Sequence, residues 1–438
     1  MNVTRVDTAS RAPSRMVRRV LGDDANLYLF GITFSTAVLA VANIVAARAL
    51  GPTGKGQLAL VIASATFAVA LTAPGLDQAI ARGLAIGGPA RARAASALPA
   101  SLLIVTVAPG VASAVFYGLA VSHAGGELIM WAAASGAVFG ALALLLSALV
   151  GLKRPVTMFV ARTVGAVITL AVIAGGALAG LTVSDAIAAF VIGAIATGAL
   201  ALREIGRTER LRWFGRPHGL GTALKVGIRA GIGQALTAVN YRFDFLLVGS
   251  IAGSTQLGIY SVSVSVTEVF WMLADANAQA VSQRAAASPD PAAARRVLAH
   301  AVRRVARGLA IGSAVVIIFG FWLIPAAFGS AFSAAYLPAV ALLPGMMALG
   351  VWKVFIAYLF ARGFDYAGAL TAGIGAVVGV ALDLVLIPRF GIVGASIAAS
   401  IGYSISLITV VVTFYVREAR GRHGVGTTPT GGPTGSAS

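Results

Sequence analysis

Charged residues stand inside apolar stretches of this chain, where they could bind ions or an anionic ligand. The segment NYRFDFLLVG carries Arg242 and Asp244 two positions apart. Further along, Glu268, Trp271 and Asp275 follow one another at spacings of three and four residues, which places them on one side of a helix. An arginine donates well to phosphate or carboxylate oxygens. Because ionisable groups inside a membrane are costly, they usually mark a substrate or ion pathway.

The elements that must position these residues are membrane-spanning helices. The chain has 438 residues, of which 58% are hydrophobic and 11% charged, with a mean hydropathy of +0.90. A soluble domain carries about 25% charged residues, and a spanning helix needs roughly 20 apolar residues. Twelve such runs are predicted. They lie at about 27–50, 57–80, 97–119, 128–150, 158–180, 183–202, 226–252, 257–281, 304–326, 335–360, 366–388 and 391–416.

The basic residues lie almost entirely on one side of this arrangement. With these spans, 28 of the 33 Lys and Arg residues fall in one set of loops and tails. Basic residues favour the cytoplasmic face, so both termini are expected inside a multi-pass protein of the cell membrane. The net charge of +18 then reflects topology, and no nucleic-acid partner is expected. The expected organisation is a basic cytoplasmic tail (1–24), an N-terminal six-helix lobe (25–206), a cytoplasmic basic linker (207–221), a C-terminal six-helix lobe (222–416) and a disordered cytoplasmic tail (417–438).

An internal duplication relates the two halves. The segment GPTGKGQL can be aligned with GSTQLGIY, which pairs Gly51 with Gly253 and Thr53 with Thr255. Later in the chain, the tripeptide GAV recurs in both halves. Six spans in each half mean that both halves enter the membrane from the same side. Parallel repeats of this kind enclose a substrate pathway between them, which indicates a transporter.

The buried charges can be ranked by depth. Arg242 and Glu268 each lie ten or eleven residues from the outer ends of their spans, roughly 15 Å deep, so we expect them to pair across neighbouring spans. Arg242 and Asp244 must point apart, because positions i and i+2 do not share a helix face. The candidate substrate-binding residues are Arg242, Lys353, Arg48, Glu268, Asp244, Asp275 and Trp271. The candidates for the inner mouth are the repeat-related Arg82 and Arg284, and those for ion coupling are Asp77, Glu268 and Asp383.

Signatures of an enzyme are missing from the sequence. The four histidines fall in loops or tails on both sides of the predicted membrane, and the chain has no cysteine. No Ser/His/Asp grouping and no metal-ligand spacing emerges. We therefore expect a protein that is not an enzyme and needs neither a cofactor nor a metal ion.

Five stretches carry a resemblance to a known family. They are AARALGPTGKGQLAL, APGLDQAIAR, YRFDFLLVGSIAGSTQLGIYSVS, FGSAFSAAYLPAVALL and IPRFGIVGASIAASIGYSIS. Together they make the chain resemble the polysaccharide and lipid-linked oligosaccharide flippases (Wzx-like) of the multidrug/oligosaccharidyl-lipid/polysaccharide (MOP) exporter superfamily. The last stretch is shared with drug exporters of that superfamily, so it indicates the fold more than the substrate.

The resemblance implies an all-α integral membrane fold with two six-helix lobes around a V-shaped cavity that opens to alternate faces. It implies a polyprenyl-pyrophosphate-linked oligosaccharide as substrate, moved from the cytoplasmic to the outer leaflet for cell-surface polysaccharide biosynthesis. The partners implied are membrane lipids, glycosyltransferases and a polysaccharide polymerase. By the match of YRFDFLLVG to the family's polar seventh span, Arg242 is the leading contact for the pyrophosphate headgroup.

Two other functions stay open on the sequence. Acidic residues outnumber basic ones among the buried charges, which suits a multidrug/cation antiporter of the same fold driven by protons or sodium. A membrane-embedded glycosyltransferase or ligase is the third possible function. It requires long outer loops or clustered catalytic acids, and the predicted loops on that side are very short.

Overall fold

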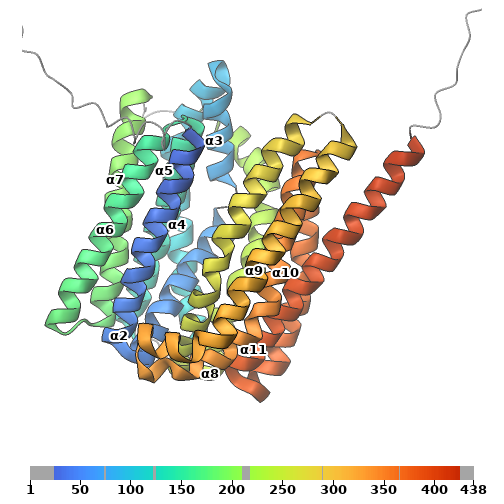
Figure 1. The fold of residues 1–438 in the computed structure, drawn as a ribbon. Helices are drawn as coiled ribbons and strands as arrows, with labels where there is room; N and C mark the ends of the chain where they lie inside the picture. The colour runs from blue at the N-terminus through green and yellow to red at the C-terminus, as the bar shows by residue number, and fades with distance from the viewer. Residues whose placement is uncertain are drawn as a thin grey trace, which may run out of the picture.

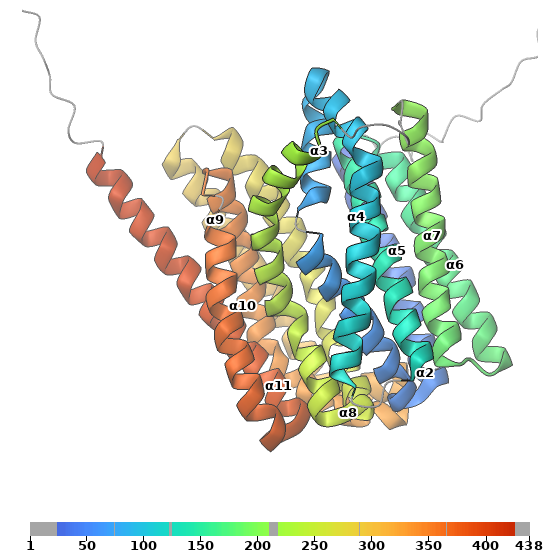
Figure 2. The same ribbon diagram turned by 180° about the vertical axis from the view of Figure 1, so that it is seen from behind.

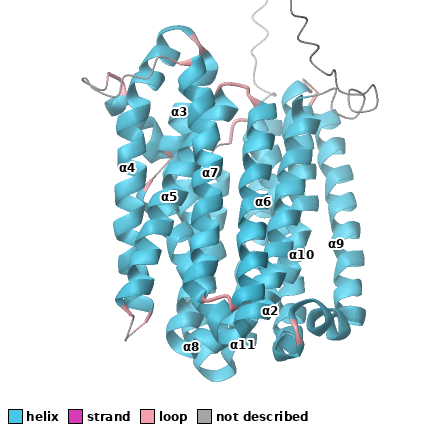
Figure 3. Cartoon of the chain, turned by 90° about the vertical axis from the view of Figure 1, so that its left-hand side faces the viewer, coloured by secondary structure: helices cyan, strands magenta, loops and turns pink. Residues whose placement is uncertain are grey.

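The computed structural model describes residues 24–73, 75–121, 125–209, 218–288, 290–364 and 366–424, and within them the chain is helical, with no strand (Figure 3). The helices are α2 Asp24–Thr72, α3 Leu76–Ile86, α4 Gly88–Ala120, α5 Gly126–Gly151, α6 Pro155–Ala179, α7 Val183–Thr208, α8 Leu220–Ala287, α9 Pro291–Phe328, the short 3-10 helix η1 Ser330–Ala335, α10 Tyr336–Ala361 and α11 Ala367–Gly424.

Three of these helices contain two membrane crossings each. α2, α8 and α11 are interrupted by non-helical glycines, at Gly51, Gly253 and Gly391. In α2, the Lys55 ammonium donates to Asn43 Oδ1 at 2.6 Å. On a straight helix these residues would lie roughly 18 Å apart, so the chain reverses at the glycine. Nine described helices are long and apolar enough to cross a membrane. Because three of them double back, the predicted twelve crossings are confirmed.

Rows of large apolar side chains face outward along these helices. Neighbouring members of a row are three or four residues apart, the spacing of one helix face. The clearest rows are Leu103, Val107, Val111 and Val115 on α4, and Ile311, Val315, Ile318 and Trp322 on α9. A soluble monomer rarely exposes such extended apolar surface. The chain is therefore a multi-pass membrane protein.

The spans form two groups, α2–α7 and α8–α11, that lie side by side (Figures 1 and 2). The described chain begins and ends on the same face, drawn at the top of both views. The loops of this face carry most of the basic residues, and it is called the arginine-rich face below. The reversals of α2 and α8 lie on the opposite face.

Repeat-related glycines adopt the same backbone geometry. Gly51 has φ 66° and ψ −178°, and Gly253 has φ 83° and ψ 170°. A positive φ with extended ψ is open to glycine and strained for other residues. These are the two glycines that the sequence alignment pairs, so the parallel repeat is present in the fold.

A second pair of repeat-related glycines shows the same equivalence in packing. A Cβ atom on Gly165 would lie 1.9 Å from Thr197 Oγ1, and one on Gly375 would lie 1.9 Å from Ser406 Oγ. Both glycines belong to the recurring GAV tripeptide. Each permits one helix to pack directly on the hydroxyl-bearing face of the next.

The second predicted span, 57–80, is wrong in one respect, because it is not continuous. α2 ends at Thr72, Gly75 is left-handed (φ 63°), and α3 begins at Leu76. A proline followed by a glycine at 74–75 is a strong helix-breaking signal, which the uniformly apolar composition obscured. The break places Asp77 in the first turn of α3.

The chain ends differ in part from expectation. α11 is helical through Gly424, so residues 417–424 of the tail expected to be disordered extend the last span. There the Arg417 guanidinium lies over the Phe364 ring, 4.8 Å from its centroid. The basic tail at 1–23, most of the linker (210–217) and residues 425–438 lie outside the described residues.

Candidate functional site

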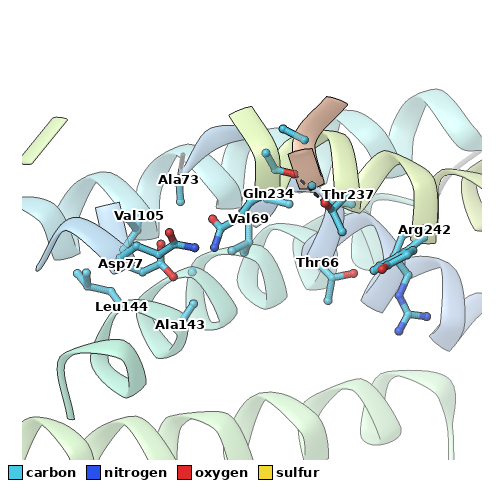
Figure 4. Close-up of a pocket in the computed structure, with 18 of the residues that line it drawn as sticks. Thr66, Val69, Ala73, Asp77, Val105, Ala143, Leu144, Gln234, Thr237 and Arg242 are labelled. Atoms are coloured by element: carbon cyan, nitrogen blue, oxygen red, sulfur yellow. Dashed lines mark hydrogen bonds between the residues drawn. The ribbon is translucent and has the colours of Figure 1, made fainter. Parts of the chain in front are cut away.

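A cavity of about 1130 Å³ lies between the two lobes. Exposed residues line it at the arginine-rich face, among them Arg82, Lys225 and Tyr366, so the cavity opens there. Its deep end is marked by Arg242. Figure 4 shows Asp77 near one end and Arg242 at the other, with Gln234 and Thr237 between them.

The lining combines cations, neutral polar groups and aromatic rings. The described charged residues that line the cavity are three cations and one acid: Arg82, Lys225, Arg242 and Asp77. The neutral polar groups are Thr66, Gln78, Gln234, Thr237 and Tyr241, and the other aromatic rings are Trp352, Phe360 and Tyr366. This lining is positive, although the buried charges taken from the sequence are mainly acidic.

The expected pair of Arg242 and Glu268 is present. Arg242 Nη2 lies 2.9 Å from Glu268 Oε1, and the two side chains are 32% and 29% exposed. Both residues belong to α8, on either side of the reversal at Gly253. The guanidinium also lies over the Phe245 ring, 5.4 Å from its centroid. Glu268 is not among the described residues that line the cavity, so it holds Arg242 from the side.

Asp244 points away from Arg242, as its position two residues on requires. It is buried and accepts a hydrogen bond from the Tyr260 hydroxyl at 2.5 Å and another from the Phe245 amide at 2.8 Å. Asp383 is also buried, and its Oδ1 has no hydrogen-bond partner among the described residues. Neither lines the cavity, so the expected role of Asp244 as a cavity residue is corrected to a position inside the C-terminal lobe. The expected role of Asp383 in ion coupling stays a prediction.

Two other expected cavity cations are bound elsewhere. Lys353 Nζ donates to Asp275 Oδ1 at 2.7 Å, and its side chain is 15% exposed. Arg48 Nε donates to the Ala327 carbonyl at 2.7 Å, and its Nη2 donates to the Ala326 carbonyl, at the C-terminal end of α9. Lys353, Asp275 and Arg48 are absent from the described lining of the cavity. They connect spans to one another.

Arg82 and Arg284 do not share a mouth, which corrects the expectation from the repeat. Arg82 lines the cavity, whereas Arg284 lines a separate pocket between α8 and α9. Asp77 lies in the cavity wall, where its Oδ2 accepts from Ser147 Oγ at 3.3 Å and its Oδ1 has no hydrogen-bond partner among the described residues. The side chain of Trp271 lies outside the described part of the chain.

The end of the cavity opposite the arginine-rich face is closed where the two reversals touch. Thr53 Oγ1 and Thr255 Oγ1, which the repeat relates, lie 2.8 Å apart. A Cβ atom on Gly56 would lie 1.7 Å from the Ser254 carbonyl oxygen, and the reciprocal clash arises at Gly258. The backbones therefore meet with no room for a side chain.

Several residues of this region were missed from the sequence. Lys55, which falls between the first two predicted spans, is buried and bonded to Asn43. Gln234 and Thr237 are neutral, so a search for charged residues inside apolar spans does not find them. With Tyr241 they nevertheless follow the spacing of one helix face. That spacing was the signal available for them.

No family model matches this chain, and no curated protein matches it in sequence. Solved structures do share its fold. One is an inward-facing multidrug resistance MATE family transporter of the MOP superfamily, at TM-score 0.70 and 15% identity over 88% of this chain and 95% of that one.

Two further solved structures broaden the comparison. The lipid II flippase MurJ in an inward closed conformation gives TM-score 0.72 and 14% identity, over 89% of this chain and 87% of that one. A MOP superfamily transporter from Pyrococcus furiosus, described as having a binding pocket of reversed polarity, gives TM-score 0.58 and 15% identity over 93% and 99%. The chain thus has the fold of MOP-superfamily transporters.

Proposed function

We propose that this protein flips a polyprenyl-pyrophosphate-linked oligosaccharide across the cell membrane, from the arginine-rich face, taken as cytoplasmic, to the opposite leaflet. The observation that carries the proposal is the lining of the cavity between the lobes. Among the residues that the structure describes, three cations and one acid line it, together with amide, hydroxyl and aromatic groups.

This lining suits both parts of such a substrate. Sugar hydroxyls both donate and accept hydrogen bonds, and Gln78, Gln234 and Thr237 offer matching groups. The pyrophosphate is an anion, and Arg82 and Lys225 stand at the mouth where it would enter. A hydrophilic headgroup could thus be sheltered from hydrocarbon while the polyprenyl chain stays in lipid.

Arg242 is the cation placed to meet the headgroup at the deep end. Its ion pair with Glu268 uses Nη2, whereas a guanidinium carries five N–H donors in a planar fork. The remaining N–H groups could therefore donate to a phosphate oxygen without breaking the ion pair. Glu268 would keep the guanidinium oriented toward the cavity when no substrate is bound.

Fold and chemistry together favour transport over catalysis. The solved structures that share the fold are transporters, one of them a flippase of lipid II. In the proposed setting, glycosyltransferases supply the substrate on the arginine-rich side, and a polysaccharide polymerase consumes it on the other.

One observation favours a second function, a cation-coupled multidrug antiporter. Asp77 lies in the cavity wall with Oδ1 unpartnered among the described residues, and such a carboxylate can hold a proton or a cationic drug. One solved structure with the same fold is described as a multidrug resistance MATE family transporter.

The test is flipping in proteoliposomes of a fluorescent oligosaccharide on a polyprenyl pyrophosphate. We expect flipping by the wild type, and at least a roughly tenfold lower rate for Lys225→Gln and for Arg242→Gln, because each removes a cation from the lining. Arg303→Gln is the matched control, since Arg303 is exposed on α9 and lines neither cavity.

A contrary result is equally definite. If the wild type does not flip this lipid but expels a cationic dye along a proton gradient, and Asp77→Asn abolishes that efflux, the antiporter replaces the flippase. If flipping is unchanged in both cation variants, the cavity is not the headgroup pathway.

A further inference from the structure

A second pocket lies between the end of α8 and the beginning of α9. These two helix ends lie at the arginine-rich face (Figure 1). Its volume is about 350 Å³. The polar residues that line it are Asn277, Arg284, Arg296, His300 and Arg304, over a floor of alanine and valine side chains. No described carboxylate lines the pocket.

The arginines of this pocket are poorly neutralised. Within the described chain, Arg284 and Arg304 form no ion pair with a carboxylate, and Arg304 Nη2 lies 3.2 Å from His300 Nε2. Arg296 is 3.7 Å from Asp290, a contact between side chains that are 75% and 56% exposed. Asp290 is moreover engaged as the N-cap of α9, where hydrogen bonds from the Ala292 and Ala293 amides lower the pKa of its carboxyl.

Elsewhere on the same face, arginines pair with less exposed carboxylates: Glu209 is 10% and Glu204 21% exposed, whereas Asp290 is 56% exposed. In the N-terminal lobe, Arg91 Nη2 lies 2.5 Å from Glu209 Oε1, and Arg154 is paired with Glu204. A positive-inside flank needs arginines but does not need them gathered around a hollow. The pocket therefore holds a concentration of positive charge that topology alone leaves unexplained.

The position of the pocket relative to the bilayer follows from α9. The outward apolar row on this helix begins at Ile311 and continues to Trp322. Arg304 precedes Ile311 by seven residues, roughly 10 Å along the axis, and His300 lies one turn farther out. From that position the long side chain of Arg304 can reach back to the headgroup layer next to the hydrocarbon.

We propose that this pocket binds the phosphate of an anionic phospholipid headgroup. The guanidinium groups of Arg284 and Arg304 come from two helices, and each can donate two N–H groups to phosphate oxygens. Juxtamembrane arginines attract anionic lipid on the cytoplasmic side. The adjoining apolar row of α9 offers the surface that acyl chains need. A soluble phosphate shares the headgroup chemistry but makes no use of that row. The site is independent of what the central cavity transports.

The experiment is native mass spectrometry of the purified full-length protein with added phosphatidylglycerol, and with phosphatidylcholine as the neutral lipid. The test variant is Arg284→Gln/Arg304→Gln. The matched control is Arg303→Gln/Arg307→Gln, which also removes two positive charges. Both of these arginines lie on α9, and each donates to a carbonyl of its own helix.

We expect roughly tenfold weaker phosphatidylglycerol binding in the test variant and less than about twofold weaker binding in the control, with phosphatidylcholine unaffected. Equal losses in both variants, or none in the test variant, overturn the proposal. A parallel titration with inorganic phosphate distinguishes the source. If phosphate occupies the same site and phosphatidylglycerol does not, the ligand is soluble and the lipid assignment is wrong. If the test variant does not remain monodisperse, Arg284→Lys/Arg304→Lys replaces it. This variant keeps the positive charge but loses the paired N–H donors of the guanidinium groups. Unchanged lipid binding in this variant also contradicts the proposed contact between the guanidinium groups and the phosphate.

Discussion

At the scale of residues, Arg242 and Glu268 define how a charge is tolerated at the deep end of the cavity. Each side chain is about a third exposed, so the pair is neither fully screened by water nor fully buried. Removing one partner strands the other in a region of low dielectric constant, while removing both leaves no such charge.

We therefore expect Arg242→Gln and Glu268→Gln each to destabilise the protein, and the double variant to be more stable than the sum of the two losses predicts. With this exposure the coupling energy should be about 1 kcal/mol. Unfolding of the variants in mixed micelles measures it. Strictly additive losses would show that the two side chains do not interact.

Which residue contacts were predictable depended on whether they lie along one helix or across a reversal. The divergence of Arg242 and Asp244 follows from helical periodicity, and the depth of Glu268 follows from counting residues. By contrast, the burial of Lys55 results from the turn at Gly51, which brings Asn43 beside it. No count along an unbroken span could show that contact.

At the scale of elements, the reversals of α2 and α8 form the closure opposite the arginine-rich face. For the cavity to open on the side opposite the arginine-rich face, the side chains of Thr53 and Thr255 must separate. The chain has no cysteine, so introduced thiols have no native competitors.

We expect Thr53→Cys/Thr255→Cys to form a disulfide under mild oxidation, because the two hydroxyl oxygens lie 2.8 Å apart. The oxidised protein should lose transport, and reductant should restore it, since the bond prevents this face from opening. Transport is measured in proteoliposomes. Disulfide formation is measured in a variant whose linker between the lobes can be cleaved, because only the disulfide then keeps the two halves together on a gel. Each single cysteine variant is the control. Full transport in the oxidised protein would mean that these reversals do not separate during the cycle.

The break before α3 shows what hydropathy leaves out. Residues 57–80 read as one apolar span, yet the helix stops at Thr72 and restarts at Leu76. A hydropathy average over the span does not register the proline and glycine at 74–75, although these two residues interrupt the helix. The interruption moves Asp77 to a helix start facing the cavity, a placement that composition could not supply.

At the scale of the whole molecule, orientation follows from charge. We expect the arginine-rich face to be cytoplasmic, because cytoplasmic loops carry an excess of basic residues. Ala299→Cys on that face should react with a membrane-impermeant maleimide in inside-out vesicles and not in intact cells, and Ser330→Cys on the opposite face should do the reverse. Both positions are exposed. The inverted labelling pattern would reverse the proposed direction of transport.

The number of crossings and the two-lobe arrangement were predictable because apolar runs and parallel repeats are global patterns. The cavity charge was not. From the sequence, the buried ionisable groups are mainly acidic. In the structure Asp244, Asp275 and Glu268 each have a partner, and none of these three acids lines the cavity. Only the packing of the lobes determines which charges face the space between them.

The contact between Thr53 and Thr255 also records history. A residue that meets its own counterpart across a two-fold axis is the hallmark of an isologous homodimer, where each mutation counts twice. A half-length ancestor that paired with a copy of itself would have made this closure already. After a gene fusion each side could diverge alone, and the repeat now pairs Lys55 with Leu257. On this account, the asymmetry between the two halves is, in evolutionary terms, the younger feature of the molecule.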